Sequence, residues 1–185
     1  MTANAARAVE APDLTAAVRA AAAGDPKAFA VLVSATRDRL FRLACRVVGD
    51  ADDGADVLQD AYLRAFASLR RGEFDGRASI DTWLYRVALT VALNTRRSRL
   101  RGQARDAAAP RPSVDALEQA QARLHLREAF EWMRELPDEQ YAAMVLRGLE
   151  GLSTKETAEV LGCSEGAVEQ RLVRAREALR RRSEQ

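Results

Sequence analysis

The sequence predicts an all-α fold, with two small helical domains joined by a flexible linker and a helix-turn-helix in the second domain. Three observations support this class. Ala, Leu, Arg and Glu are common whereas aromatic residues make up 5% of the chain, a composition that favours helices over sheets. Apolar residues recur with a helical period on both sides of residues 102–114. That stretch contains two prolines and no apolar period, which is typical of an extended linker.

Four helices are predicted before the linker. The second begins at Asp25-Pro26, with proline at its first helical position. Asp53 is expected to cap the third helix. A glycine-containing loop over residues 70–82 then leads to a fourth helix, which begins near Trp83. We expect these helices to form the first domain.

The predicted fourth helix carries a polar stripe. Arg86, Thr90, Asn94 and Arg97 recur at i, i+4, i+8 and i+11. Donors at this spacing follow a nucleic-acid backbone. A solvated helix face has the same pattern, and this helix alone supports both interpretations equally.

The most specific motif of the C-terminal half lies in residues 152–176. Ser153 and Glu156 form an S-x-x-E capping box, Gly162 is free to take a positive φ at the turn, and Ser164 caps a second helix. This layout is typical of a helix-turn-helix, whose second helix enters the major groove, although a plain helical hairpin would share it. The side of the second helix opposite its apolar stripe carries Glu165, Glu169, Gln170, Arg171 and Arg174.

The predicted boundaries divide the chain into four parts. These are a disordered leader over residues 1–12, an N-terminal domain over 13–101, the linker over 102–114 and a C-terminal domain over 115–185.

Charge is clustered although the net charge is only +2. Arginines concentrate in residues 96–105 and again in residues 171–182, whereas aspartates concentrate in residues 50–60. Two basic clusters and a separate acidic patch favour two nucleic-acid contacts and one protein contact.

Several function classes find no support in the sequence. The two cysteines lie in apolar surroundings and His125 is the only histidine, so neither a disulfide framework nor a histidine-bearing zinc site is expected. No nucleotide-binding glycine motif or histidine-assisted nucleophile is present, so we expect no enzyme, no catalytic residue, no metal and no cofactor. The chain also lacks a signal-peptide core and an apolar run long enough to span a membrane. We therefore expect a cytoplasmic protein without membrane insertion.

Three segments resemble the extracytoplasmic-function (ECF) sigma factors, the small two-domain class of bacterial sigma factors. Residues 56–66 (DVLQDAYLRAF) are similar to the polymerase-binding helix of that family, and residues 74–97 are similar to its promoter-melting segment. Residues 136–177 are similar to its C-terminal domain. The segments follow the order and spacing of the family. The resemblance assigns the N-terminal domain to sigma region 2 and the C-terminal domain to sigma region 4.

The resemblance implies three partners: core RNA polymerase at its β′ clamp and β flap, promoter DNA, and a separate anti-sigma factor. The residues implied to bind polymerase are Asp56, Gln59, Asp60, Leu63 and Arg64.

The resemblance also implies two modes of promoter contact. The −10 element is melted, with one base held in a loop pocket, and the −35 element is read as duplex. The residues implied to contact the −10 element are Phe74, Asp75, Gly76, Arg77, Ser79, Trp83, Arg86, Thr90, Asn94 and Arg97. The residues implied to contact the −35 element are Lys155, Ser164, Glu165, Glu169, Gln170, Arg171, Arg174 and Arg176.

Alternatives remain open at this point. Trp83 suits a core wedge at the start of an amphipathic helix better than it suits a strand contact. Glu169 departs from the basic or small polar residue common in the family, which predicts an unusual −35 preference or less dependence on that contact. A helix-turn-helix regulator that binds duplex DNA without polymerase would explain the C-terminal domain. It would not explain the polar stripe or the acidic helix.

Overall fold

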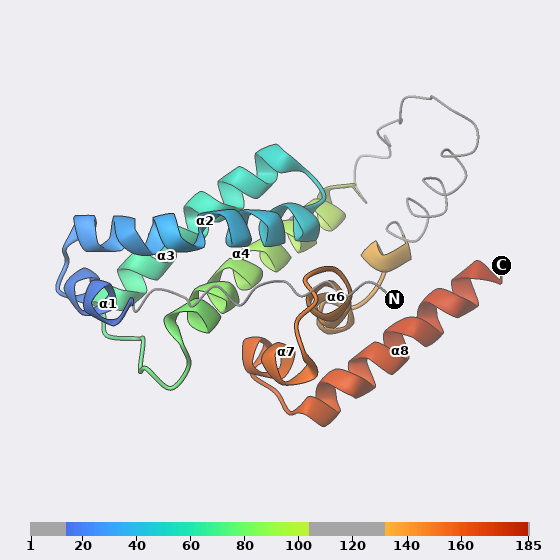
Figure 1. Cartoon of the computed structure of the whole chain (residues 1–185). Helices are drawn as coiled ribbons and strands as arrows, with labels where there is room; N and C mark the ends of the chain where they lie inside the picture. The colour runs from blue at the N-terminus through green and yellow to red at the C-terminus, as the bar shows by residue number, and fades with distance from the viewer. Residues whose placement is uncertain (1–13, 104–131, 185) are drawn as a thin grey trace, which may run out of the picture.

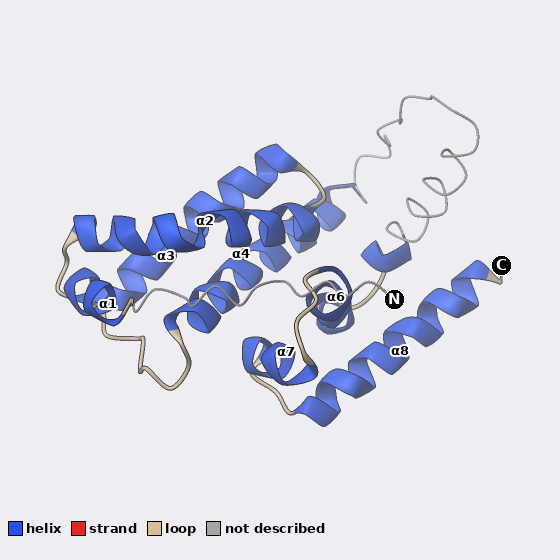
Figure 2. Cartoon of the chain, in the orientation of Figure 1, coloured by secondary structure: helices blue, strands red, loops and turns tan. Residues whose placement is uncertain are grey.

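The structure, a computed structural model, describes residues 14–103 and 132–184. Every regular element in these two ranges is a helix, which confirms the predicted all-α class (Figure 2). The predicted leader, the linker from residue 104 onward and most of the helix expected after the linker lie outside the described residues.

The N-terminal half is built on three long helices that contact one another pairwise. In Figure 1, α4 runs along the pair formed by α2 and α3, and α1 lies across one end of that pair. The fourth helix extends two residues into the stretch assigned to the linker. The elements are α1 (Thr15–Ala22), α2 (Pro26–Val48), α3 (Ala51–Arg70) and α4 (Ile80–Gln103).

Aspartate side chains cap the N-termini of α2 and α3. The second helix begins with proline at its first position, as predicted. The Asp25 carboxylate caps it by accepting from the Lys27 backbone N–H at 2.8 Å. The prediction that Asp53 caps α3 is wrong. Asp50 is the cap, and its carboxylate accepts from the N–H groups of Asp52 and Asp53 at 2.9 and 3.0 Å. The helix therefore begins earlier than expected, because the first of several neighbouring aspartates is already in extended backbone geometry.

The C-terminal half contains α6 (Asp138–Met144), which continues as the π-helix η1 (Val145–Leu149), followed by α7 (Thr154–Leu161) and α8 (Glu165–Ser183). The capping box is present as predicted. Ser153 Oγ accepts from the Glu156 N–H at 3.1 Å, and the Glu156 carboxylate accepts from the Ser153 N–H at 2.7 Å. Gly162 takes φ +63° at the turn, a left-handed conformation that glycine adopts without steric cost.

The two halves share one hydrophobic core. On α4, Leu84, Ala88 and Val91 are buried, and Tyr85 and Leu89 on an adjacent face are buried as well. These residues belong to the same cluster as apolar residues of the C-terminal half. The C-terminal members of this cluster are Met133, Leu136, Tyr141, Ala142, Val145, Leu146, Val160 and Ala175.

Candidate polymerase and nucleic-acid interfaces

The acidic face of α3 is exposed. Asp56, Gln59 and Leu63 lie on one side of the helix, and the Leu63 side chain is 65% exposed. Asp60 and Arg64, one turn apart on the same side, form an ion pair at 2.8 Å. A single exposed leucine does not by itself mark a binding surface, but an apolar side chain with charges around it resembles the apolar centre and polar rim of a protein interface. The structure thus brings together all five residues that the sequence assigned to polymerase binding.

The loop over residues 71–79 begins with a charged pair. Arg71 Nε donates to Glu73 Oε1 at 2.5 Å. This hydrogen bond, with a second from Ser68, lowers the pKa of Glu73 to about 2. Glu73 is therefore an anion at neutral pH, and its carboxylate is directed to Arg71.

A cavity of about 600 Å³ lies between this loop and α1. Asp75, Gly76 and Ser79 contribute from the loop, and Val18 and Arg19 contribute from α1. The sequence analysis found the loop residues but missed the wall formed by α1, because no local pattern indicates where a short helix will dock. A cavity lined by both apolar and polar groups can accommodate a planar base.

The aromatic residues of this region pack against each other. The Phe74 and Trp83 rings lie 5.4 Å apart between centroids, and both are half-buried. The Trp83 side chain packs against two apolar clusters, which favours the core-wedge interpretation. Arg77 is exposed and pairs with Asp75 at 3.3 Å.

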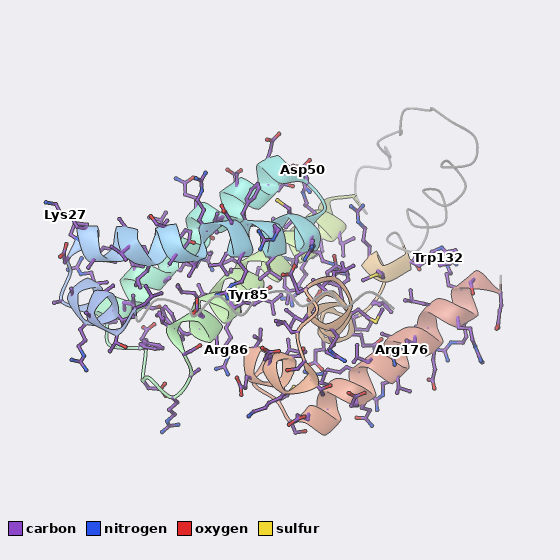
Figure 3. The ribbon with its side chains drawn as sticks, in the orientation of Figure 1. Lys27, Asp50, Tyr85, Arg86, Trp132 and Arg176 are labelled. Atoms are coloured by element: carbon purple, nitrogen blue, oxygen red, sulfur yellow. The ribbon has the colours of Figure 1, made fainter. Side chains whose placement is uncertain are left out.

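The N-terminal part of the polar stripe on α4, formed by Arg86 and Thr90, contacts the C-terminal half through Arg86. Arg86 Nε donates to the backbone carbonyl of Glu159 on α7 at 2.8 Å. Figure 3 shows Tyr85 and Arg86 on the part of α4 nearest to α7. The Thr90 hydroxyl donates to the Arg86 carbonyl at 2.8 Å, so its proton is used within the helix although the residue is exposed.

In the C-terminal part of the stripe, formed by Asn94 and Arg97, the arginine is bound by a carboxylate of the C-terminal half. Arg97 Nε donates to Asp138 Oδ2 at 2.8 Å, and a second guanidinium nitrogen contacts the same oxygen. Asn94 is exposed and accepts from Arg97 at 3.4 Å. Two of the four stripe residues, Arg86 and Arg97, are thus bound to the C-terminal half.

The helix-turn-helix presents a mixed surface. Glu165, Gln170 and Arg174 are exposed on α8, as are Lys155 on α7 and Arg176 on α8. Val173 is 48% exposed between these polar groups, and the sequence analysis did not select it. An exposed valine on a recognition helix can contact a thymine methyl group.

Two predicted base readers have partners within the domain. The Thr154 hydroxyl donates to Glu169 Oε1 at 2.9 Å, which fixes the acid on the side facing α7. Arg171 is half-buried, pairs with Glu139 at 3.0 Å and donates to Cys163 Sγ at 3.1 Å. In this conformation neither side chain extends freely from α8.

Residues assigned to different promoter elements meet in one surface hollow of about 410 Å³. Lys155, Ser164 and Glu165, from the predicted −35 set, line this hollow together with Arg86 from the −10 set. The structure therefore places the two predicted DNA surfaces next to each other.

Nowhere in the two described ranges do three His, Cys, Asp or Glu side chains gather as metal ligands would. Among the helices of residues 14–103 and 132–184, none combines the length and apolar character that crossing a bilayer requires.

Comparisons with known proteins agree with this architecture. A family model described as Sigma-70 region 2 matches residues 32–102, and one described as Sigma-70, region 4 matches residues 127–179. These two regions in this order define the class of RNA polymerase sigma factors. RNA polymerase sigma-H factor of Pseudomonas aeruginosa is 33% identical over 169 residues, covering 84% of this chain and 86% of that protein. ECF RNA polymerase sigma-E factor of Escherichia coli K12 is 34% identical over 174 residues, with coverage of 84% and 86%.

The chain belongs to the ECF family of RNA polymerase sigma factors, as the sequence resemblance predicted. Among solved structures, CnrH in complex with the cytosolic domain of CnrY aligns with a TM-score of 0.60 and 28% identity, covering 91% of this chain and 96% of that one. The sigma factor RpoE in complex with the anti-sigma factor NepR from Bartonella quintana shares the fold, with a TM-score of 0.55 at 22% identity over 84% of this chain and 96% of that one.

Proposed function

We propose that this sigma factor binds core RNA polymerase in the cytoplasm and directs initiation at specific promoters, reading the −35 element as duplex and holding the melted −10 element. It acts by binding and not as an enzyme, and no cofactor is involved. The observation that carries this proposal is the presence, in one chain, of regions 2 and 4 with an exposed acidic and apolar face on α3.

The α3 face supports docking on polymerase. Leu63 offers an exposed apolar contact, while Asp56 and the Asp60–Arg64 pair surround it with charge. Interfaces of this kind combine an apolar centre with a polar rim that orients the partner. We propose the β′ clamp as the surface that receives α3, and the β flap as the contact for the C-terminal domain.

The cavity beside loop 71–79 supports capture of one base from the opened −10 element. Extruding a base from a stacked duplex costs a few kcal/mol, so a pocket must compensate with contacts of its own. Polar groups from Asp75 and Ser79 lie at the cavity, and the backbone of Gly76 allows close approach. The arginines of α4 would then hold the separated strand through its phosphates.

The surface of α8 supports −35 recognition. Gln170 is exposed and suits adenine, whose N6 and N7 groups a glutamine side chain can contact together. Lys155, Arg174 and Arg176 are exposed cations that suit phosphate contacts, which set the register of the helix. Arg171 suits guanine once its pairing with Glu139 is released.

Regulation by an anti-sigma factor is part of this proposal. One solved sigma factor of the same fold is bound to the anti-sigma factor NepR. We propose that a partner of the same kind binds this chain and covers its polymerase-binding surface.

Run-off transcription tests the proposed function. The full chain would be combined with bacterial core polymerase on a promoter library that varies both elements. The expected result is initiation at a fixed distance from one combination of −35 and −10 sequences, with loss of product when either element changes. Absence of any defined start site would contradict the proposal.

A regulator that binds duplex DNA without polymerase is the second candidate, favoured by the exposed polar surface of α8. A gel-shift assay with the same library distinguishes the two. Sequence-specific duplex binding by the chain alone, without any effect on core polymerase, would favour the regulator.

A further inference from the structure

We propose that Arg19 of α1 is a specificity-determining residue of the cavity beside loop 71–79, and that its guanidinium selects an extruded base with two adjacent hydrogen-bond acceptors, cytosine or guanine, over adenine and thymine. The inference rests on the proposed function, because it concerns the base that this cavity takes from the opened −10 element. It adds a residue of α1 to the loop and α4 residues assigned to that element.

The docking of α1 presents one face of this helix to the cavity. Four residues that recur at i, i+3, i+4 and i+7, and so share a face, line the cavity: Thr15, Val18, Arg19 and Ala22. Leu14 and Ala21 are buried in an apolar cluster whose other buried members are Leu32 of α2 and Leu69 of α3. In Figure 1, α1 lies beside the loop that leads into α4. The buried residues fix the rotation of α1 about its axis, so Arg19 is held at the cavity wall.

Arg19 differs from the charged and hydroxyl groups around it because its side chain has no partner. Within residues 14–103 and 132–184, its guanidinium forms no hydrogen bond or ion pair. Asp75 and Asp81 each pair with an arginine that does not line the cavity, at 3.3 and 2.6 Å. The Ser79 hydroxyl shares a hydrogen bond of 2.9 Å with the Thr82 hydroxyl. Among the described residues that line the cavity, Arg19 is therefore the cation available to a ligand.

Apolar side chains beside Arg19 indicate that a base ring, and not a phosphate, occupies the cavity. Those that contribute to the lining include Val18, Leu69, Phe74 and Ile80. An extruded base packs its faces on such groups and is identified through hydrogen bonds to its edge. Arg77 of the loop lies outside the lining, and its side chain is 90% exposed. A phosphate at the surface suits Arg77, whereas the base edge suits Arg19.

The shape of the guanidinium decides which bases it can select. It carries donors only, in a planar fork that can form two parallel hydrogen bonds. Cytosine offers two adjacent acceptors, N3 and O2, and guanine offers N7 and O6. Neither adenine nor thymine has two adjacent acceptors on its Watson–Crick or Hoogsteen edge. Because an unpaired base exposes both edges, the fork favours cytosine and guanine.

Arg19 also has a structural contribution that the test must separate from base selection. It lies in the last turn of α1, where a cation interacts favourably with the helix dipole. A lysine supplies the same charge at this position but lacks the planar fork. Arg19→Lys therefore preserves the interaction with the helix and removes the proposed selection.

The test compares Arg19→Ala, Arg19→Lys and Arg37→Ala with the unmodified full chain. Arg37 is the matched control, an exposed arginine of α2 that does not line the cavity. The first readout is run-off transcription with core polymerase on templates in which each −10 position carries each of the four bases. The second uses the chain alone and measures, by fluorescence anisotropy, its affinity for a labelled oligothymidylate of about 12 nucleotides with or without one central cytosine, guanine or adenine.

For the unmodified chain, we expect one −10 position that favours cytosine or guanine over adenine and thymine by on the order of tenfold, the discrimination of one bidentate base contact. Arg19→Ala and Arg19→Lys should both lose this preference, while the other −10 positions keep theirs. Arg37→Ala should match the unmodified chain. In the oligonucleotide assay, a central cytosine or guanine should tighten binding to the unmodified chain and leave binding to both Arg19 variants unchanged.

Three results would overturn the inference. The first is a preference that survives Arg19→Ala. The second is an equal loss of initiation with all four bases, which would indicate a phosphate contact. The third is full preference with Arg19→Lys, which would show that charge suffices without the fork. Circular dichroism checks the fold of each variant, and should Arg19→Ala fail to fold, Arg19→Gln makes the same prediction.

The two readouts separate this inference from the proposed function, because the oligonucleotide assay needs no polymerase. Initiation at defined promoters without a preference for cytosine or guanine at any −10 position would overturn the inference and leave sigma activity in place. An Arg19-dependent preference among the oligonucleotides without initiation at any promoter would support base selection and contradict the proposed function.

Discussion

The hydroxyl of Tyr85 donates a hydrogen bond of 2.7 Å to the carboxylate of Glu150, which joins α4 to the segment that follows η1. Both side chains are nearly excluded from solvent, at 4% exposure for the tyrosine residue and 7% for the carboxylate side chain. A hydrogen bond to a buried charge contributes more than one between neutral groups. The contact therefore offers a direct measure of how firmly the two halves are joined.

Replacing this tyrosine, Tyr85→Phe, should lower the free energy of unfolding by about 1.5–3 kcal/mol, because Glu150 loses a partner in a buried site. Burial, and next the hydrogen bond to Glu150, raises the pKa of Tyr85 above its ordinary 10. The tyrosine contribution should thus be complete below pH 10 and decline as the pH rises above it. Urea unfolding of both proteins across this range checks the prediction. An equal stability of the two at neutral pH would contradict it.

Gly54 marks the close crossing of α2 and α3. A Cβ at this position would lie 2.5 Å from Cys45 Sγ and 3.2 Å from the Cys45 backbone nitrogen. Gly54→Ala should therefore destabilise the protein by about 1–3 kcal/mol through overpacking, and Cys45→Ala should recover part of the loss. Gly166→Ala is the matched control, because no described atom beyond its chain neighbours and the nearby backbone of its own helix lies within 4 Å of its Cβ position. Thermal unfolding that ranks both alanine variants equally would refute the close crossing.

Local signals account for what could be predicted from the sequence. Ser153 and Gly162 mark helix ends through chemistry confined to a few residues, so their roles were predictable. The burial of Arg96 was not, since an arginine within a basic cluster is usually solvated. Its partner Asp138 lies 42 residues away, and only the tertiary arrangement brings the two together. The docking of α1 against loop 71–79 was missed for the same reason.

The capping box of α7 should make stability depend on acid pH. The Ser153 hydroxyl, and next its backbone N–H, lower the pKa of Glu156 below its ordinary 4.5. Because the folded carboxylate holds its proton less tightly than the unfolded one, its contribution is present above pH 4.5 and is lost as the pH falls below that value. Glu156→Gln keeps a hydrogen-bond acceptor without the charge. Chemical denaturation should show a difference between the two proteins at neutral pH that disappears in acid.

Reversing one charge on α3 should separate polymerase binding from folding. Asp60→Arg places a cation beside Arg64 on the exposed acidic face, so we expect loss of co-elution with core polymerase while the helical circular dichroism persists. Asp38→Arg is the control, the same substitution at an exposed position of α2. Retained co-elution of the Asp60 variant would reject this face as the docking surface.

Gln170 and Arg171 are neighbours on α8 with different surroundings, which predicts different consequences of removing each. Gln170 is exposed, so Gln170→Ala should change −35 selectivity by about 1–3 kcal/mol and leave the melting temperature unchanged. Arg171 pairs with Glu139 and contacts Cys163, so Arg171→Ala should relax selectivity by a similar amount and also reduce stability. Glu139→Gln separates the two effects, because it removes the ion pair without removing the base contact. The measurements are transcription from −35 variants and thermal unfolding of each protein. An unchanged promoter ranking for both α8 substitutions would contradict the assignment, because the helix would then carry no sequence information at these positions.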